Sequence, residues 1–285
     1  MKKALILALA VLPVLFSCNK SNTNGGGAKL ETPKNANEAA KVTISESAEV
    51  KVTTKDQKEV ALKEINFMRS GRYIATAEDI GTKASNVITL AGTFTFSNGK
   101  YTLSGDLTVT VSTTSSSVTV TTSAGETQTA DATVTPSNVP EGSTEDKICR
   151  TWTIDHIILN FEKLGGTARY DNIVEIVNDI KAHKIDLKED QEKAILNHDI
   201  KEITLDKDII CVTFANAEPF KGSWQLSANN SFSYKIENFN GSVFNAEATG
   251  TISFNGELAV VDIVVKSDIK DLGNGTAQLT LKAVK

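Results

Sequence analysis

The chain contains few of the residues from which catalytic and metal sites are built. Its 285 residues include only three histidines and three cysteines. His156, His183 and His198 lack the close spacing of zinc ligands. No serine lies in a Gly-x-Ser-x-Gly turn, and Gly25 to Gly27 do not lie between a strand and a helix. We therefore expect no metal, no cofactor and no catalytic residue, and a protein that is not an enzyme. A hydrolase with a carboxylate site that the sequence does not reveal is the alternative.

Charge and hydropathy exclude two further possibilities. The net charge is −5, whereas a protein that binds nucleic acid needs a basic face. Beyond the N-terminal segment, no apolar run approaches the roughly 20 residues of a membrane-spanning helix. We expect no nucleic-acid partner and no spanning helix in the body of the protein.

The first eighteen residues predict export and a lipid anchor. Lys2 and Lys3 precede an apolar run at 4–16, which is typical of a secretory signal peptide and too short to span a membrane permanently. The run ends in Leu15-Phe16-Ser17-Cys18, which resembles the lipobox of bacterial lipoproteins. The resemblance implies that residues 1–17 are a signal peptide and that Cys18 carries lipid at a membrane. An ordinary signal peptide that happens to contain a cysteine is the alternative.

Composition divides the next part of the chain into a tether, a β module and a linker. Residues 18–41 are rich in Asn, Lys and Gly, and we expect a flexible tether. Residues 42–135 predict an antiparallel β module, with a hairpin at Asn98-Gly99 and alternating Val and Thr within 108–121. A glycosylated stalk is the alternative for residues 108–135, which are rich in Ser and Thr. Prolines and glycine at 136–146 predict a linker.

The second module, residues 147–285, is expected to be an eight-stranded antiparallel barrel. A long strand at 148–159, with Ile148, Trp152, Ile154 and Ile158 on its inner face, precedes amphipathic helices at about 170–197. Seven strands follow, at 200–205, 209–215, 221–227, 231–238, 246–254, 257–266 and 275–283. The fold class is therefore mainly β, with a helical pair inserted after the first strand of the second module.

The two modules share an internal repeat. Residues 62–67 align with 200–205, 73–75 with 211–213, 92–97 with 222–227, and 101–103 with 232–234. The order and the alternation agree, so we expect two related antiparallel β modules, of which the first lacks the helical insertion. Chance similarity between amphipathic strands is the alternative.

Four short sequences carry a resemblance to a known group. They are the Leu-x-Ser-Cys signal, Ser70-Gly71-Arg72-Tyr73-Ile74, Cys149-Arg150-Thr151-Trp152 and Gly222-Ser223-Trp224. The chain resembles a group of uncharacterised Bacteroidetes lipoproteins with lipocalin-like folds. The resemblance implies a lipocalin-like second module and a lipid-anchored protein of the bacterial cell envelope. In such lipoproteins an acidic cluster after the cysteine is associated with the cell surface. Residues 19–23 lack acids, so we expect the outer membrane, facing the periplasm.

Two sets of residues are candidates for a structural or binding role. Cys149 and Cys211 could form a disulfide in an oxidising envelope, or remain separate half-buried thiols. Five aromatic residues could line an apolar ligand site inside the barrel, with plain core packing as the alternative. They are Trp152, Phe214, Trp224, Phe232 and Tyr234.

The sequence as a whole predicts a lipid-anchored envelope protein with a binding or interaction role. Its partner, besides the membrane, would be an apolar small molecule, a glycan or another envelope protein. A structural or accessory lipoprotein with a solid core and no ligand is the alternative. A hollow second module would favour a ligand, whereas a solid one with a large exposed apolar patch would favour a protein partner.

Overall fold

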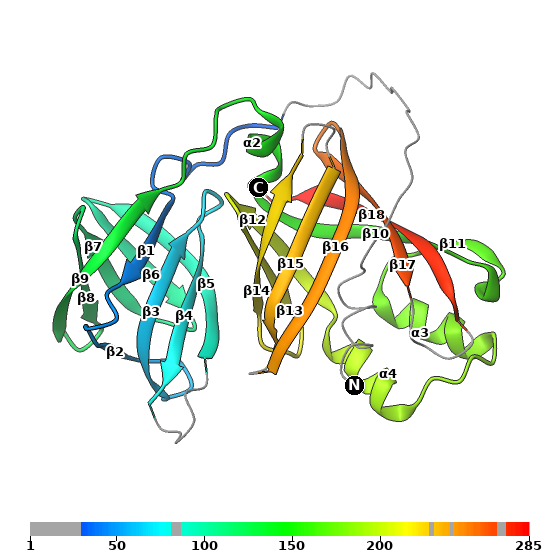
Figure 1. The fold of residues 1–285 in the computed structure, drawn as a ribbon, viewed down its shortest axis with the longest axis horizontal. Coiled ribbons are helices and arrows are strands. Elements are labelled where there is room, and N and C mark those ends of the chain that lie inside the picture. The colour runs from blue at the N-terminus through cyan, green and yellow to red at the C-terminus, as the bar shows by residue number, and fades with distance from the viewer. Residues whose placement is uncertain (1–29, 81–86, 228–230, 240–241, 267–271, 285) are drawn as a thin grey trace.

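The computed structural model describes residues 30–80, 87–227, 231–239, 242–266 and 272–284. The predicted signal peptide, Cys18 and the first part of the predicted tether lie outside these residues. In the described part, two β modules lie side by side and are joined through a short helix (Figure 1). The chain is mainly β, as predicted. In the same part, no helix has both the length and the apolar character needed to span a bilayer.

The first module is a closed antiparallel barrel of eight strand positions. Its strands are β1 (Ala40–Ile44), β2 (Val50–Thr53), β3 (Glu59–Phe67), β4 (Arg72–Asp79), β5 (Val87–Ser97), β6 (Lys100–Gly105), β7 (Val109–Thr113), β8 (Ser117–Thr122) and β9 (Thr127–Pro136). β1 closes the ring by pairing with both β9 and β3. β1 and β2 share one strand position in the barrel, because both pair with β3. β1 pairs with residues 64–67 of β3, and β2 pairs with residues 59–62. The Val/Thr-rich stretch forms β7 and β8, so the strand prediction is confirmed and the stalk is wrong.

Aromatic side chains fill one end of this barrel. Phe67 stacks on Tyr101 with ring centroids 3.7 Å apart, and Phe94 meets Phe67 edge-on at 5.3 Å. Gly92 leaves room for the Tyr73 ring, because a Cβ at Gly92 would lie 2.6 Å from that ring. An eight-stranded barrel is just wide enough for side chains to fill, and this core follows that rule.

Gln128 in β9 ties β2 to the barrel through its side chain. Its side-chain oxygen accepts a hydrogen bond of 2.9 Å from the backbone N–H of Lys51, and its side-chain amide donates one of 2.7 Å to the carbonyl of Lys51. One side chain therefore satisfies both backbone groups of a residue at the edge of the ladder.

The second module is a curled antiparallel sheet with short helices. Its strands are β10 (Thr151–Phe161), β11 (Gly166–Tyr170), β12 (Ile200–Asp206), β13 (Ile209–Phe214), β14 (Phe220–Leu226), β15 (Ser231–Phe239), β16 (Ser242–Asn255), β17 (Leu258–Lys266) and β18 (Asn274–Ala283). Its helices are α2 (Thr144–Ile148), α3 (Ile173–Ala182) and α4 (Glu189–Asn197), with a 3-10 turn at Glu162–Leu164. The sheet order is β11-β10-β12-β13-β14-β15-β16-β17-β18.

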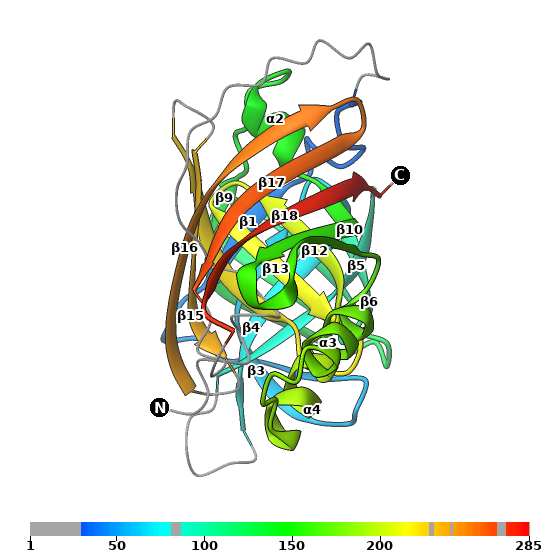
Figure 2. The ribbon, with the colours of Figure 1, turned by 90° about the vertical axis from the view of Figure 1, so that its right-hand side faces the viewer.

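β10 links the two ends of this sheet. It pairs with β18 along residues 152–160, but with β12 only at Thr151 and Trp152. Farther along it pairs with β11, and α3 and α4 lie beside that hairpin (Figure 2). The apolar face of α3 is buried in the core, so the predicted amphipathic helix is confirmed. The β10–β11 hairpin that precedes α3 was not predicted.

The prediction of which β10 side chains point inward is wrong for the residues after Ile154. The pairing of β10 with β18 slips between Ile154 and His156. A bulge adds one residue to the strand and so reverses which side chains point inward. Trp152 is buried before the bulge, whereas Ile158 after it is only half-buried. The residues buried after it are Ile157, Leu159 and Phe161.

The end of the predicted tether lies against both modules. Leu30 packs on the core of the second module, and the backbone N–H of Asn35 donates to the carbonyl of Arg69 at 3.2 Å. β1 begins at Ala40, before the predicted boundary, and α2 begins within the predicted linker. The composition of this segment does not allow it to form a core of its own. The segment is instead held against the two modules, as the packing of Leu30 on the second module shows.

The structure supports the internal repeat. β3 to β6 and β12 to β15 are consecutive antiparallel strands in the same order. β3 slips against β4 between Leu62 and Glu64, and β12 slips against β13 between Ile200 and Glu202. These are the positions that the alignment makes equivalent. Bulges are specific features of a strand, so a shared one argues against chance similarity.

One part of the alignment needs correction. Ala75 pairs with Ile65, and Val212 pairs with Ile203, which is the counterpart of Ile65. Residues 73–75 therefore correspond to 210–212 and not to 211–213. The difference arises because the connection from β12 to β13 is one residue shorter than the connection from β3 to β4.

Removal of the Gln128 side chain should weaken the closure of the first barrel. Gln128→Ala leaves the two backbone groups of Lys51 without these partners, and we expect a loss of about 1–2 kcal/mol in the free energy of unfolding. Urea denaturation measures it. Thr133→Ala, at an exposed position of the same strand, is the control and should change stability by less than about 0.5 kcal/mol. Equal effects of the two substitutions would contradict the role of Gln128.

Candidate binding cleft between the modules

The two modules meet through equivalent faces. Glu64 in β3 pairs with Lys221 of the second module, and its counterpart Glu202 in β12 pairs with Arg72 of the first. Ile74 in β4 and Cys211 in β13, which the corrected alignment makes equivalent, lie in one small apolar cluster. An interface in which equivalent surfaces face each other is isologous, as in a two-fold symmetric dimer. We therefore describe this seam as an internal pseudo-two-fold interface.

A buried arginine holds one end of the seam. Arg69, in the β3–β4 turn, is only 3% exposed. Its guanidinium donates to the carboxylate of Asp146 in α2, and its backbone N–H donates to the carboxylate of Asp206 at the end of β12. Ser137 and the backbone N–H of Lys207 also donate to Asp206, at 2.6 and 2.7 Å. One buried charged network thus joins the turn, the linker and β12.

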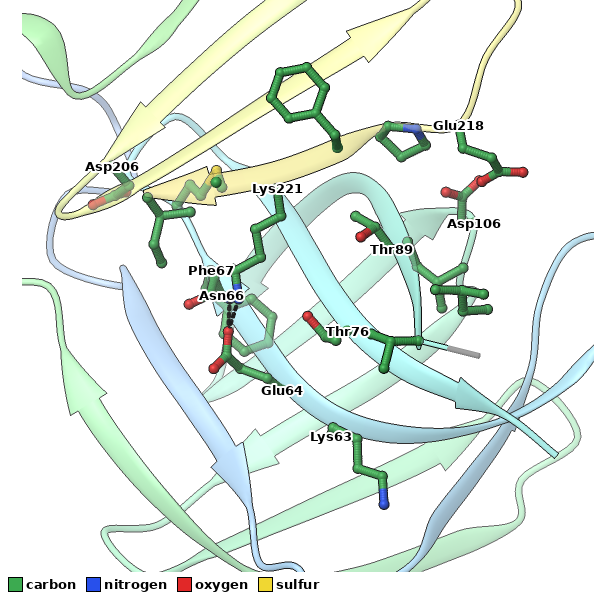
Figure 3. Close-up of a pocket in the computed structure, with 18 of the residues that line it drawn as sticks. Lys63, Glu64, Asn66, Phe67, Thr76, Thr89, Asp106, Asp206, Glu218 and Lys221 are labelled. Carbon is green, nitrogen blue, oxygen red and sulfur yellow. Dashed lines mark hydrogen bonds and ion pairs between the residues drawn. The ribbon is translucent and has the colours of Figure 1, made fainter. Parts of the chain in front are cut away.

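A cleft of about 2330 Å³ runs between the modules from this network (Figure 3). One wall comes from β1, β3, β4 and β5, and the other comes from β12, β13 and the segment 214–223. The lining mixes charged, polar and apolar side chains. Ligand pockets for drug-sized molecules enclose about 300–1,000 Å³. The cleft is therefore large enough for a ligand of greater size.

Glu64 is the centre of a charged cluster in the cleft. Lys41 Nζ lies 2.7 Å from its Oε2, while Lys221 Nζ and Asn66 Nδ2 both donate to its Oε1. Burial alone would raise the pKa of Glu64, but hydrogen bonds from Lys221, Lys41 and Asn66 lower it to about 2. Glu64 is therefore ionised at neutral pH. With two lysines against one carboxylate, this cluster has a net positive charge.

Asn66 contributes a buried acceptor to the same part of the cleft. Its side chain lines the cleft and the residue is 2% exposed. The Nδ2 group is bound to Glu64 at 2.7 Å, whereas Oδ1 has no hydrogen-bond partner in the described part of the chain. A buried acceptor without a partner costs about 1–3 kcal/mol. A hydrogen-bond donor on a bound ligand would satisfy Asn66 Oδ1 and so explain why this acceptor is present.

A second cluster in the cleft consists of Lys55 and the carboxylates of Asp106, Asp56 and Glu218. Asp106 accepts hydrogen bonds from Lys55 Nζ at 2.6 Å and from the backbone N–H of Ala91 at 2.9 Å. That hydrogen bond and the charges of Asp106, Asp56 and Glu218 raise the pKa of Lys55. Figure 3 shows Glu218 of the second module beside Asp106 of the first. Three carboxylates around one lysine give this cluster a net negative charge.

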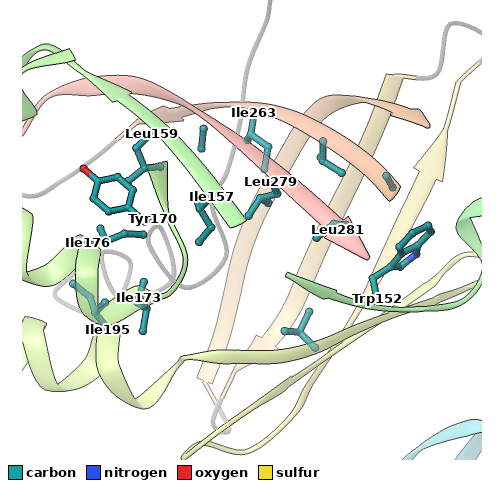
Figure 4. Packing of buried hydrophobic residues seen from close by; sticks show 14 of the residues in the cluster. Trp152, Ile157, Leu159, Tyr170, Ile173, Ile176, Ile195, Ile263, Leu279 and Leu281 are labelled. Carbon is teal, nitrogen blue, oxygen red and sulfur yellow. The ribbon is translucent and has the colours of Figure 1, made fainter. Parts of the chain in front are cut away.

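The tryptophans predicted to line a ligand site belong to the packed core of the second module. Trp152 and Trp224 are buried, and their indole N–H groups donate to the carbonyls of Ile148 and Asp206 at 3.0 and 2.5 Å. Figure 4 shows Trp152 in that core, with Ile157 and Leu159 of β10, Leu279 and Leu281 of β18, and residues of α3. Core packing, the alternative to a ligand lining, describes both tryptophans.

The other three predicted lining residues are placed differently. Phe214 is a buried member of the same core and also borders the cleft. Phe232 and Tyr234 lie in β15, but their side chains fall outside the described residues. The cleft residues Glu64 and Asn66 were not predicted. The Lys-Glu-Ile sequence shared by 63–65 and 201–203 was the available signal, because it lies at the seam in both modules.

Cys149 and Cys211 are separate free thiols. Cys149 is the C-cap residue of α2 and lies in the core of the second module, whereas Cys211 lies in the seam cluster with Ile74. The structure thus has no disulfide between them, because Cys149 ends a helix and does not lie on a strand next to β13. Burial raises the pKa of both thiols. Neither therefore has the character of a reactive thiolate.

The histidines have local partners. His156 Nδ1 lies 2.8 Å from the Asp155 carboxylate, and His183 Nδ1 lies 3.3 Å from that of Asp179. Within the described ranges, no group of three or more His, Cys, Asp or Glu residues is placed to hold a metal ion.

Comparison with known proteins gives no family assignment. No protein-family model matches the chain, and no curated protein matches it. Among solved structures, a porin-like protein from Bacteroides uniformis is a distant match, with 9% sequence identity and a TM-score of 0.22, covering 87% of this chain and 97% of that chain. A TM-score of this size does not establish a common fold. The chain is thus defined by its own architecture, two β modules with a cleft between them.

Loss of the Arg69 guanidinium should destabilise the seam strongly. Arg69→Met leaves the buried Asp146 carboxylate without its ion pair, and we expect a loss of about 3–5 kcal/mol in the free energy of unfolding. Arg72→Met, which removes the half-exposed ion pair with Glu202, is the matched control and should cost at most about 1 kcal/mol. Urea denaturation followed by tryptophan fluorescence measures both. A small effect of Arg69→Met would contradict the proposed network.

The charge of Glu64 should make stability depend on pH. Its pKa is lowered from 4.5 to about 2 on folding, so the ionised carboxylate stabilises the folded protein above pH 4.5. That contribution is lost as the pH falls from about 4.5 to about 2. We expect Glu64→Gln to destabilise the protein most at neutral pH and progressively less below about pH 4.5. Unfolding measured across this range checks it. A difference that stays constant with pH would show that the carboxylate charge is not responsible.

Proposed function

We propose that this protein is a lipid-anchored binding protein of the bacterial cell envelope and that its ligand lies in the cleft between the two modules. Cys18 would carry the lipid, and the outer membrane facing the periplasm is the proposed location. One observation carries the binding role: a cleft of about 2330 Å³ is lined by Asn66, whose buried Oδ1 has no hydrogen-bond partner among the described residues. The seam network supports it, because a fixed arrangement of the modules gives the cleft a fixed width.

The packing of the modules favours the cleft over a site inside either of them. Aliphatic side chains, with aromatic rings at one end, fill the first barrel, and the second contains the buried Trp152 and Trp224. We further propose that the second module is a lipocalin-like eight-stranded barrel. The pairing of β10 with both β12 and β18 supports that description. In this proposal the barrel is a scaffold for one wall of the cleft.

The two alternative functions have less support. A structural lipoprotein without a ligand leaves Asn66 Oδ1 without a donor among the described residues. A hydrolase needs a carboxylate that can transfer a proton, but Glu64 is bound by two lysines and its pKa is lowered to about 2. Burial raises the pKa of Asp206, yet its carboxylate accepts hydrogen bonds from Ser137, Arg69 and Lys207, so its role is structural.

Native mass spectrometry of the mature protein, purified gently from envelope extract in mild detergent, tests the proposal. We expect an extra mass beyond the lipid anchor that is lost on denaturation. Thr76→Trp should abolish it, because Thr76 lines the cleft and the indole would fill space there. Thr119→Trp, on the β8 strand of the first barrel, is the matched control and should retain it. An extra mass that Thr76→Trp retains, or a bare protein in every preparation, would contradict binding in the cleft.

A further inference from the structure

The charges of the cleft are separated along its length. The Glu64 cluster contains Lys41 and Lys221 and has a net positive charge. The cluster around Lys55 contains Asp106 and, close by, Glu218 from the opposite wall. Figure 3 shows Glu64 and Lys221 in one part of the cleft and Asp106 and Glu218 in another. A ligand that complements both clusters carries an anionic group and a cationic group, held apart.

The acceptor of Asn66 adds a requirement for a neutral donor. Asn66 Nδ2 is held by Glu64 at 2.7 Å, which fixes the side-chain amide, and Oδ1 is left without a partner in the described structure. The two lysines on Glu64 already exceed its charge, so a further cation is disfavoured at this place. An amide N–H or a hydroxyl supplies a hydrogen bond without adding charge.

The lining distinguishes between classes of ligand. The phenylalanines that border the cleft, Phe67, Phe214 and Phe220, are at least 94% buried. They present no broad ring face for a sugar to stack on. Charged side chains on both walls disfavour a lipid, whose burial needs an apolar lining. An extended peptide combines amide N–H groups with side chains of both signs.

We propose that the cleft binds an extended peptide segment of an envelope protein, with one amide N–H donated to Asn66 Oδ1. This inference rests on the proposed function and names the ligand class of the same site. An acidic side chain of the peptide faces the lysines of the Glu64 cluster. A basic side chain faces Asp106 and Glu218. The two charged clusters, each with residues from both walls, therefore contact opposite charges of one segment.

Selection from a phage-displayed library of random dodecapeptides, on the full mature protein in detergent, tests this inference. We expect enrichment of peptides that carry both an acidic and a basic residue. The dissociation constants of synthetic copies are then measured by fluorescence anisotropy. Asn66→Leu should weaken binding about threefold to tenfold, and Glu218→Lys should weaken it severalfold. Lys100→Glu, at an exposed position outside the cleft, is the control for a change of surface charge and should bind as the wild type does.

Each result decides for or against the peptide. Circular dichroism checks that every variant folds, and Thr76→Trp, which blocks the cleft, replaces Asn66→Leu if that variant does not. Failure to enrich any sequence, or enriched peptides that bind all variants equally, would overturn the inference. The extra native mass that Thr76→Trp abolishes would then still support a cleft ligand of another class. Asn66-dependent binding of a peptidoglycan hexasaccharide, with no selected peptide, would identify that class as a glycan.

Discussion

The arrangement of the two modules depends on the burial of Arg69 between two carboxylates. Asp146 belongs to α2 and Asp206 to β12, so the β3–β4 turn of the first barrel is bound to two separate segments of the second module. A buried charge is costly unless it is paired, and Asp146 supplies the ion-pair partner of Arg69. The network therefore favours one relative position of the modules. The cleft starts at the Arg69 network, and the relative position of the two modules sets the distance between its walls.

Aligned positions of the two modules carry the same residue at some places of the seam and different residues at others. Glu64 and Glu202 occupy equivalent places next to the same bulge, and each binds a cation of the opposite module. Other equivalent positions differ: Asn66 corresponds to Thr204, and Ala91 to Lys221. The two glutamates are thus common to both modules, whereas the differences, which include the cations that these glutamates bind, give the two walls different chemistry. A ligand bound in the cleft would therefore contact different residues on the two walls, although the strands that form these walls follow the same order.

The sequence predicted the local features well and the cleft not at all. Period-two alternation and the Asn98-Gly99 pair place the strands of the first barrel because both act within a few residues. The bulge in β10 depends on its partner β18, so the strand's own pattern does not reveal it. Arg69 and Asp206 are 137 residues apart, and no local signal brings them together. Cys149 was assigned to a strand because its apolar neighbours do not distinguish a helix end from a strand start.

The central claim is that the space between the modules, and not the interior of either one, is the binding site. A crystal structure of the mature protein purified gently from its native envelope tests this most directly. We expect ordered ligand density between Glu64 and Asp106, with a donor atom within hydrogen-bond distance of Asn66 Oδ1. Ligand density inside the second module, next to Trp152 or Trp224, with the cleft holding only water, would contradict it.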